Sequence, residues 1–476
     1  MKNAISFFSP KHVKVTTTFR TEVLAGITSF FASIFTILSV PGMISGGAAY
    51  EPGIFNAVLI AAIISGIVGC LFMAFIAKMP LVVYPAMGTT SYFAFTALPM
   101  IVVLSGDENL SRMMQYHIGL FLFLISGVIF SLLSITGLTE KILNGIPKNI
   151  KIATVPAIGL FITLLGARLG GLVVGVPSTF VTFFNPRNLT SDDPGLQRAA
   201  IGAIVCFIGL LLLGFLHYKK VKASFVIAIV VTAILAYVTG AAVMPADFTF
   251  HLGQQFSDFA TYGFLAFDAT TIWSFGSFGA VIGVILSIVL ALLLTNALDA
   301  IATTYGIAKN ANLVESDEDP AGRKYVNKGV IADALSSVIG GVLGGAPNTT
   351  VVSGSAGVNA GGRTGLTSLV VAILTGLLLV AGPFITLIPN VAIAPALIFV
   401  GCLMLTGLKN LDFDDMSEYL PAFVALVFVV FTFNIGIGIC LALLTHIILK
   451  LCSGKLKEIS LVSVIITILF LLQFIL

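Results

Sequence analysis

Long apolar stretches separated by short polar segments run from near the N-terminus of the chain to its end. A helix needs about 20 mostly apolar residues to cross the hydrocarbon core of a bilayer. Most of the apolar stretches reach or approach this length, so the pattern predicts a helical membrane protein with many spans. We place the spans at Val23–Met43, Ile54–Ala77, Val82–Leu104, Gly119–Ile135, Ile150–Leu165, Ala200–Leu216, Ala223–Val243, Phe278–Ile307, Gly329–Leu343, Val351–Asn359, Leu366–Leu387, Ala392–Leu408, Leu420–Phe433 and Gly436–Leu451, followed by an apolar tail at Ile459–Leu476.

Composition agrees with this pattern. Of the 476 residues, 58% are hydrophobic and 9% are charged, whereas a soluble domain carries about 25% charged residues. The cysteines and histidines form no CxxC or Cys/His spacing typical of a metal site. The sequence contains no nucleotide-binding motif either. We therefore expect no cofactor, no metal, no nucleic-acid partner, and neither an ATP-driven pump nor an enzyme.

Basic residues indicate how the spans are oriented. If the N-terminus is cytoplasmic, 20 of the 24 Lys and Arg residues fall on the cytoplasmic side, as the positive-inside rule requires. Residues 45–53, 245–277 and 388–391 would then be outside, and they contain no Lys or Arg. The sequence predicts a multi-pass protein of the plasma (bacterial inner) membrane, embedded in lipid, with a cytoplasmic N-terminus. Two placements of the apolar tail stay open: it spans the membrane, or it lies on the surface.

One stretch between apolar spans departs from the pattern. Residues 344–365 contain many Gly residues, a Pro and a high density of Ser, Thr and Asn side chains. Irregular backbone at membrane depth persists only where protein covers it or where it lines a cavity. Interrupted apolar segments of this kind mark the binding sites of secondary transporters. We therefore predict a transport site here; the alternative is a Gly-rich loop outside the membrane.

A similar segment occurs in the third span. In Tyr84–Ser91 and in Ala346–Val351 a Pro precedes two neighbouring Thr residues at the start of an apolar span. The two segments lie seven spans apart in the list above. An odd number of spans per repeat gives the two repeats opposite orientations in the membrane. The sequence thus predicts an inverted repeat.

Each interrupted segment is expected to open a half-helix near the middle of the membrane. A helix N-terminus presents unpaired N–H groups and the positive end of the helix dipole, which suits carbonyl oxygens, planar amides or anions. Substrate contacts are therefore predicted at Thr90 and Ser91 in the third span and at Val351, Val352 and Ser353 in the tenth. In the alternative interpretation, the hydroxyl groups only cap their own half-helices.

Asp299 is the only charged residue between Phe278 and Ala308. An acidic side chain at the centre of a membrane helix costs about 2.5–3.5 kcal/mol on insertion scales, so it is expected to face a polar interior. Asn296 and Thr303 share its helical face by their spacing. We predict that Asp299 contacts the substrate and carries the coupling proton, with Asn296 and Thr303 as further contacts. The alternative is a structural acid bound to a neighbouring helix.

Several motifs resemble the guanine/hypoxanthine permease branch of the nucleobase/cation symporter (xanthine/uracil permease) family, from about residue 17 to residue 457. The Gly-Gly-Arg-Thr-Gly run at residues 361–365 is the most specific of them. The segments that carry the resemblance are Thr18–Thr28, Pro85–Thr96, Leu298–Thr303, Ala332–Leu335, Ser355–Leu366 and Ala394–Gly401.

The resemblance implies an all-α polytopic membrane fold of about fourteen spans in two inverted repeats of seven, with short strands before the half-helices of spans 3 and 10. A core domain would comprise residues 1–136 and 271–390, and a gate domain residues 137–270 and 391–476. The acid of the family's eighth span falls on Asp299. Homodimers are common in this fold, so a homodimer is a further implication.

Two positions depart from the family. The family typically has a Glu in span 10 that pairs with ring nitrogens of the base, and Ser353 stands there; an Asn in span 3 is replaced by Thr90. A carboxylate accepts two N–H bonds, whereas a serine presents one rotatable hydroxyl. These departures keep a second substrate class open.

The function that the sequence favours is secondary active uptake of a nucleobase, purine-like, or of a similar small planar heterocycle, by alternating access and coupled to H⁺ or Na⁺. The first alternative is an anion transporter of the same fold, indicated by Ser353 and the hydroxyl-rich half-helix ends. The second is a membrane enzyme or receptor. The absence of a metal or nucleophile constellation from the sequence argues against it.

Overall fold

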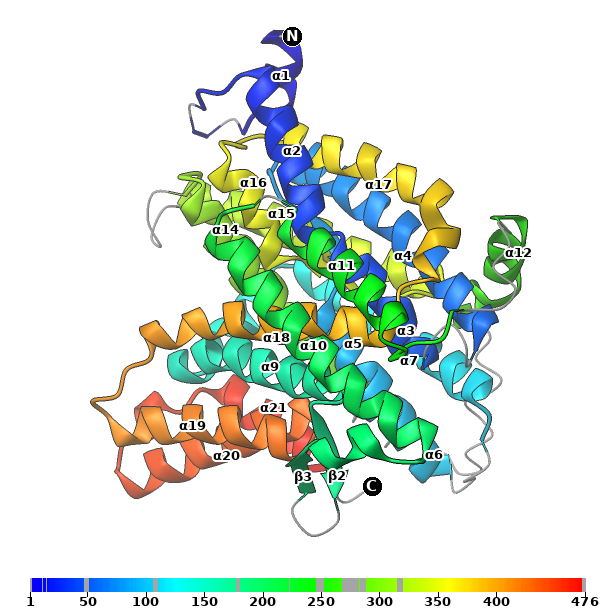
Figure 1. The fold of residues 1–476 in the computed structure, drawn as a ribbon. Coiled ribbons are helices and arrows are strands. Elements are labelled where there is room, and N and C mark those ends of the chain that lie inside the picture. Colours follow the sequence, from blue (N-terminus) through cyan, green and yellow to red (C-terminus); the bar gives the residue numbers. More distant parts are fainter. Residues whose placement is uncertain are drawn as a thin grey trace.

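Long apolar helices make up most of the structure, a computed structural model that describes residues 2–10, 12–13, 15–46, 51–105, 110–176, 180–221, 223–244, 252–267, 282, 288–314 and 320–472 (Figure 1). Within these residues, nine helices are long and apolar enough to cross a membrane, and shorter apolar helices cover Met87–Val103, Ser224–Val238 and Met416–Phe431. The predicted all-α membrane fold is confirmed.

The helices of the first half are α1 (Lys2–Phe8), α2 (Phe19–Ser33), α3 (Phe35–Ser45), α4 (Pro52–Phe72), α5 (Met87–Tyr92), α6 (Leu98–Ser105), α7 (Arg112–Ile135), α8 (Leu138–Gly145), α9 (Lys148–Leu169), α10 (Pro194–Tyr218), α11 (Ser224–Val238) and α12 (Leu252–Tyr262). Those of the second half are α14 (Leu290–Asn310), α15 (Pro320–Val342), α16 (Ser355–Asn359), α17 (Gly365–Ile385), α18 (Asn390–Met404), α19 (Met416–Phe431), α20 (Ile435–Cys452) and α21 (Leu461–Leu472). The strands are β1 (Val83–Pro85), β2 (Val173–Val176), β3 (Phe180–Phe183) and β4 (Asn348–Thr350).

The helices follow the predicted apolar spans, with three qualifications. The fourth span begins at Arg112 as α7, before the predicted start at Gly119. The first part of the predicted eighth span, residues 278–287 apart from residue 282, lies outside the described residues. The ninth span begins at Pro320 as α15, well before the predicted start at Gly329. Charged residues do not end a helix that continues beyond the apolar region, so a hydropathy pattern underestimates its length.

The two interrupted segments meet in the middle of the fold. Strand β1 pairs antiparallel with β4. The backbone N–H of Ala86 donates to the carbonyl of Pro347 at 2.8 Å, and the N–H of Val351 donates to the carbonyl of Val82 at 3.0 Å. Each strand therefore satisfies the backbone groups of the other, which irregular chain at membrane depth requires. The predicted short strands before the half-helices of spans 3 and 10 are confirmed.

Two packing groups surround this strand pair. In the first, α17 packs against α2 and α4, and α15 packs against α4 and α7. In the second, α9 packs against α18 and α19, α19 packs against α20, and α10 packs against α11 and α18. Figure 1 shows α19 and α20 gathered on the far side of α9 and α18 from α4 and α17. The boundary between the two groups positions the site described below.

Some elements are not evident from the apolar pattern. Strands β2 and β3 form an antiparallel hairpin between α9 and α10, and α12 lies between α11 and α14. In the apolar tail, the described residues form α21 up to Leu472. Its Ser463 hydroxyl donates to the carbonyl of Gly145 at the end of α8, at 2.6 Å. This contact joins the tail to α8.

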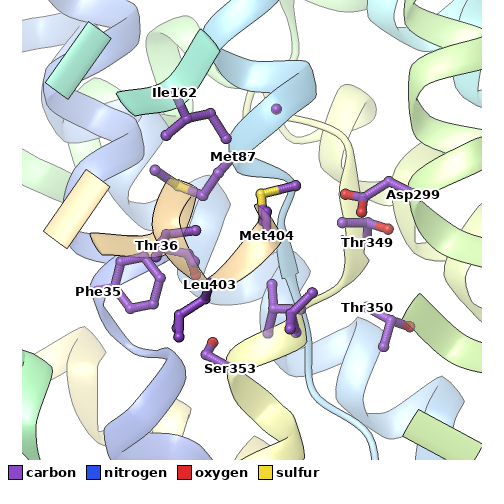
Figure 2. A pocket seen from close by; sticks show the side chains of 14 residues that line it. Phe35, Thr36, Met87, Ile162, Asp299, Thr349, Thr350, Ser353, Leu403 and Met404 are labelled. Atoms are coloured by element: carbon purple, nitrogen blue, oxygen red, sulfur yellow. The ribbon is translucent and has the colours of Figure 1, made fainter. Parts of the chain in front are cut away.

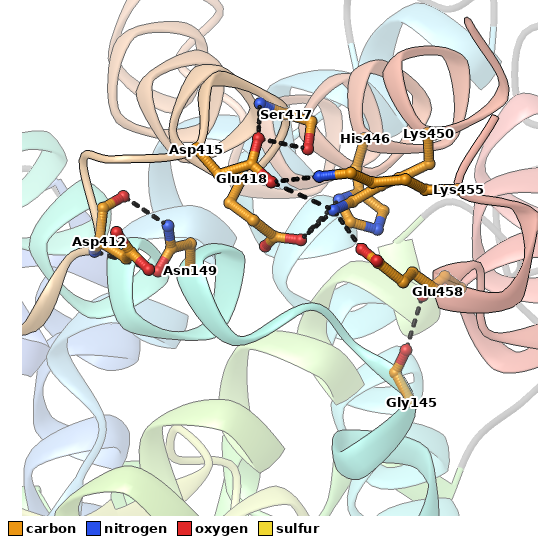
Figure 3. A network of polar contacts seen from close by, with 11 residues as sticks. Gly145, Asn149, Asp412, Asp415, Ser417, Glu418, His446, Lys450, Lys455 and Glu458 are labelled. Atoms are coloured by element: carbon orange, nitrogen blue, oxygen red, sulfur yellow. Dashed lines mark hydrogen bonds and ion pairs between the residues drawn. The ribbon is translucent and has the colours of Figure 1, made fainter. Parts of the chain in front are cut away.

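A network of charged residues fastens the chain before α21 to the second group (Figure 3). Lys450 Nζ at the end of α20 lies 2.8 Å from Glu418 Oε1 and 2.6 Å from Glu458 Oε2. Lys455 Nζ lies 2.7 Å from Asp415 Oδ2, at the N-terminus of α19. The Lys450 side chain is only 1% exposed. A buried ammonium needs carboxylate partners of this kind to offset its desolvation.

Candidate functional site

A cavity opens beside the β1–β4 pair, at the boundary between the two packing groups (Figure 2). It holds about 490 Å³ of empty space, counted together with the solvent at its open side. Its lining residues are Phe35, Thr36, Met87, Gly88, Ile162, Asp299, Thr349, Thr350, Val351, Val352, Ser353, Val400, Leu403 and Met404. Ile162 from α9 and the last three from α18 belong to the second group, whereas α3, α14 and β4, which carry Phe35, Asp299 and Thr350, pack against α4 or α15 of the first group.

Asp299 on α14 supplies the only ionisable side chain among these lining residues. It is 8% exposed, and its Oδ1 accepts a hydrogen bond of 3.3 Å from the hydroxyl of Thr303, one helical turn further along α14. In Figure 2 the carboxylate lies next to Thr349, across the cavity from Met87 and Phe35. A carboxylate with one protein partner has lone pairs left to accept hydrogen bonds from a ligand.

The tenth-span residues selected from sequence lie together on the cavity wall. Val351 follows β4, and Val352 and Ser353 form the short turn that leads into α16. The Ser353 hydroxyl lies 3.1 Å from that of Ser33 at the end of α2. Interrupted backbone thus faces the cavity here, as the Gly-rich stretch predicted.

The third-span selections, Thr90 and Ser91, do not line the cavity. On α5 it is Met87 and Gly88, at the start of the half-helix, that do so. Thr90 and Ser91 are fully buried, and their hydroxyl oxygens have no hydrogen-bond partner among the described residues. Direct substrate contact through these two residues stays a prediction that the cavity geometry does not favour.

Asn296 and Thr303 share a face of α14 with Asp299 but do not line the cavity either. The Asn296 amide donates to the hydroxyl of Ser337 on α15 at 2.8 Å. Thr303 reaches the site only through its bond to Asp299. Spacing along a helix predicts a shared face, but the packing of α15 on that face decides which residues meet the cavity.

Asp333 on α15 was not among the residues that the sequence placed in the site. Its side chain binds β4 by hydrogen bonds. Its Oδ2 accepts hydrogen bonds from the Thr350 N–H at 2.6 Å and from the Thr350 hydroxyl at 2.8 Å. Thr349 donates to the same oxygen at 3.4 Å. Asp333 is completely buried, and Thr349 and Thr350 line the cavity. Asp333 therefore positions the strand on which part of the cavity wall is built.

Sequence reasoning also missed the apolar wall. Phe35 on α3, Ile162 on α9, and Leu403 and Met404 on α18 come from spans in which no acidic residue or Gly-rich interruption marks a site. Met87 is the one apolar wall residue near a recognisable sequence feature, because it lies two residues after Pro85 at the start of the third span. Nothing in the periodicity of the other spans distinguishes a cavity-facing position from a core position.

The comparisons with known proteins agree with this architecture. A family model described as the Permease family (Xan_ur_permease) matches residues 20–441. The guanine/hypoxanthine permease PbuO of Bacillus subtilis is 31% identical over 460 residues, which are 96% of this chain and 97% of that protein. The adenine permease AdeQ of Escherichia coli is 28% identical over 468 residues, 97% of this chain and 94% of that protein.

Among solved structures, the transmembrane domain of the cyanobacterial bicarbonate transporter BicA superposes with a TM-score of 0.60 at 15% identity, covering 90% of this chain and 99% of that chain. This likeness concerns the fold, which is that of transporters built from two inverted repeats of seven spans. The predicted inverted repeat and the expectation of a transporter rather than an enzyme are confirmed. The chain, a multi-pass integral membrane protein, belongs to the permease family.

Proposed function

We propose that this protein takes up a nucleobase, a purine or a similar small planar heterocycle, by alternating access coupled to H⁺. Relatives with nearly full-length matches are guanine/hypoxanthine and adenine permeases. The observation that carries the proposal is Asp299, an acid on the wall of a mostly apolar cavity. Its free carboxylate oxygens would accept N–H groups of the base, and a neutral, protonated Asp299 would donate in turn.

The coupling proposal follows from the position of this carboxyl. The carboxyl group of Asp299 lines the substrate cavity and can gain or lose a proton. Substrate binding and protonation of this group would therefore influence each other. Na⁺ is the alternative coupling ion. H⁺ is the ion for which the cavity itself supplies a carrier, the carboxyl group of Asp299.

We also propose an orientation of the protein in the membrane and a relative motion of two domains. The distribution of Lys and Arg favours a cytoplasmic N-terminus in the plasma (bacterial inner) membrane. The two packing groups favour a core of residues 1–136 and 271–390 that moves against a gate of residues 137–270 and 391–476, although α12, near the end of the range 137–270, packs against α4 and α17 of the first group. The cavity draws its lining from both groups, so their relative displacement would change access to it. A homodimer is the assembly that we expect from the fold.

Asp299→Asn is the direct test, with Asp192→Asn as the matched control because Asp192 lies exposed in the segment before α10. Uptake of labelled hypoxanthine, guanine and adenine is measured in cells that lack their own carriers, at an acidic and a neutral external pH. We expect Asp299→Asn to lower accumulation by about ten-fold or more, the cost of losing a charged hydrogen bond, and to remove its pH dependence. Unchanged uptake and pH dependence in this variant would refute the role.

Transport of a small anion is the second candidate, because Ser353 supplies no carboxylate and the fold is shared with a bicarbonate transporter. Competition of base uptake by bicarbonate or sulfate separates the two. Anions that bind while bases do not would overturn the nucleobase proposal.

A further inference from the structure

One aromatic side chain lines the cavity. Of the fourteen lining residues, Phe35 alone carries an aromatic ring, and it lies on the side opposite Asp299 (Figure 2). Its neighbours Met87, Leu403 and Met404 are flexible or aliphatic. A planar heterocycle buries its two faces best against a flat partner, so Phe35 is the one lining residue with the shape to select for planarity.

Another aromatic ring packs against the ring of Phe35. It stacks on Phe225 of α11 with ring centroids 4.6 Å apart and an angle of 15° between the planes. Phe225 in turn meets the edge of Phe399 on α18, with centroids 5.9 Å apart. Phe35 and Phe225 are 1% and 3% exposed. One face of the Phe35 ring is thus covered by Phe225, and the side chain borders the cavity.

The backbone also fixes this ring relative to the interrupted tenth span. Phe35 begins α3, directly after the junction at Ile34. Two residues earlier, the Ser33 hydroxyl lies 3.1 Å from that of Ser353, and the Thr36 hydroxyl donates to the Ser33 carbonyl at 3.0 Å. The ring therefore enters the site preorganised, which lowers the entropic cost of using it as a binding surface.

We propose that Phe35 is the stacking surface for the planar ring of the substrate, and that Phe225 is a positioning residue that keeps this surface in place. The proposal rests on the nucleobase function proposed above and adds its specificity determinant. A heterocycle stacked on Phe35 would direct its N–H edge across the cavity toward Asp299. A tetrahedral or small trigonal anion gains little from such a surface, so Phe35 favours bases over anions.

The test is the dissociation constant of the purified full-length protein for adenine, hypoxanthine and uracil, measured by calorimetry. Phe35→Leu removes the ring, and Phe35→Met removes it with a flexible side chain that fills more of its volume. Phe35→Tyr keeps the ring. Phe30→Leu is the matched control, because Phe30 is a buried phenylalanine of the preceding helix α2 that does not line the cavity. Melting without ligand verifies that each variant is folded.

We expect Phe35→Leu and Phe35→Met to weaken purine binding by about ten-fold, equivalent to about 1.4 kcal/mol. The affinity for uracil should fall by a smaller factor, because its single ring offers less area for stacking. Phe35→Tyr and Phe30→Leu should stay near wild-type affinity. A merely structural role would weaken all ligands alike. We expect Phe225→Leu to reduce purine affinity by a smaller factor, because the Phe35 ring remains but is less restrained.

Two results overturn the inference, and they differ from failure of the proposed function. If the wild-type protein binds purines and a folded Phe35→Met variant binds them equally well, Phe35 is not the stacking surface. If purines and uracil weaken by the same factor, the ring acts only through packing. If the wild-type protein binds no base but binds bicarbonate or sulfate, the nucleobase function itself fails, and the inference fails with it.

Discussion

A buried acid near the start of the first span offers a sharp test of how the interrupted segment is held. Glu22 on α2 is 0% exposed. Its Oε1 accepts the backbone N–H of Arg363 at 3.0 Å, and its Oε2 accepts the N–H of Thr364 at 3.3 Å and the hydroxyl of Thr367 at 2.6 Å. Glu22 therefore holds the chain just before α17, whose N-cap is Thr364, and the positive end of the helix dipole favours a carboxylate there.

Replacing Glu22 by Ala leaves these three donors without their acceptor. A hydrogen bond to a charged group contributes about 1.5–3 kcal/mol, and an unsatisfied buried donor costs about 1–3 kcal/mol. Because the three bonds share one carboxylate, their losses are not additive, and we expect a total of about 3–5 kcal/mol. Glu22→Gln keeps one acceptor oxygen but turns an NH₂ group toward the remaining donors. It should fall between wild type and Glu22→Ala.

The assay is thermal unfolding of the purified protein, combined with limited trypsin digestion that reports exposure of the bond after Arg363. Glu51→Gln serves as control, because Glu51 precedes α4 without a side-chain cap hydrogen bond. We expect Glu22→Ala to melt well below wild type and to be cut at Arg363 first. An Ala variant that melts with the wild type and stays protected at Arg363 would show that Glu22 does not hold the segment.

Two further outcomes follow from close contacts in the fold. Gly357→Ala would place a Cβ 2.0 Å from the Ser29 hydroxyl; it should push α16 away from α2, lower the stability by about 1–3 kcal/mol, and weaken substrate binding, as calorimetry would show. A hydrogen bond from Lys450 lowers the pKa of Glu458 below its ordinary 4.5. The interaction of Glu458 with Lys450 therefore stabilises the fold fully at pH values above the pKa of Glu458 in the unfolded chain. This stabilisation is lost as the pH falls through the lower pKa of Glu458 in the folded protein. Glu458→Gln should melt below wild type at neutral pH, a difference that vanishes in acid, whereas Lys457→Gln should match wild type throughout.

The membrane spans were predictable from sequence because their constraint is local. A helix must be long and apolar enough to cross a bilayer whatever it packs against, and the predicted positions of α4, α7 and α17 needed nothing else. The short strands before the half-helices of spans 3 and 10 were expected only from the family resemblance. Their pairing with each other supplies the partners that interrupted backbone at membrane depth requires.

The cavity was only partly predictable, because its wall is a product of tertiary packing. The acid in an apolar helix and the Gly-rich interruption pointed to Asp299, Val351, Val352 and Ser353, which do line it. Asn296 has the right spacing, but α15 packs on that side and binds its amide through Ser337. Which residues of α9 and α18 line the cavity depends on how the second packing group packs against the first. No local sequence pattern predicts that packing.

The charge of the cavity bears on the choice between bases and anions. Among its fourteen lining residues Asp299 is the only ionisable one, and none is Lys, Arg or His. An ionised carboxylate in a low-dielectric cavity repels an anion, while it attracts the N–H edge of a neutral heterocycle. An anion could therefore enter only with Asp299 protonated, so its affinity should rise as pH falls. A neutral base can donate N–H groups to the ionised carboxylate or accept a hydrogen bond from the protonated one, as the proposed coupling to H⁺ requires, so its affinity should depend less on pH. Ser353, which is hydrogen-bonded to Ser33, stands where the resemblance implies a Glu and brings no second negative charge to this wall. Under the proposed function, recognition of the base by a carboxyl group would therefore rest on Asp299 alone.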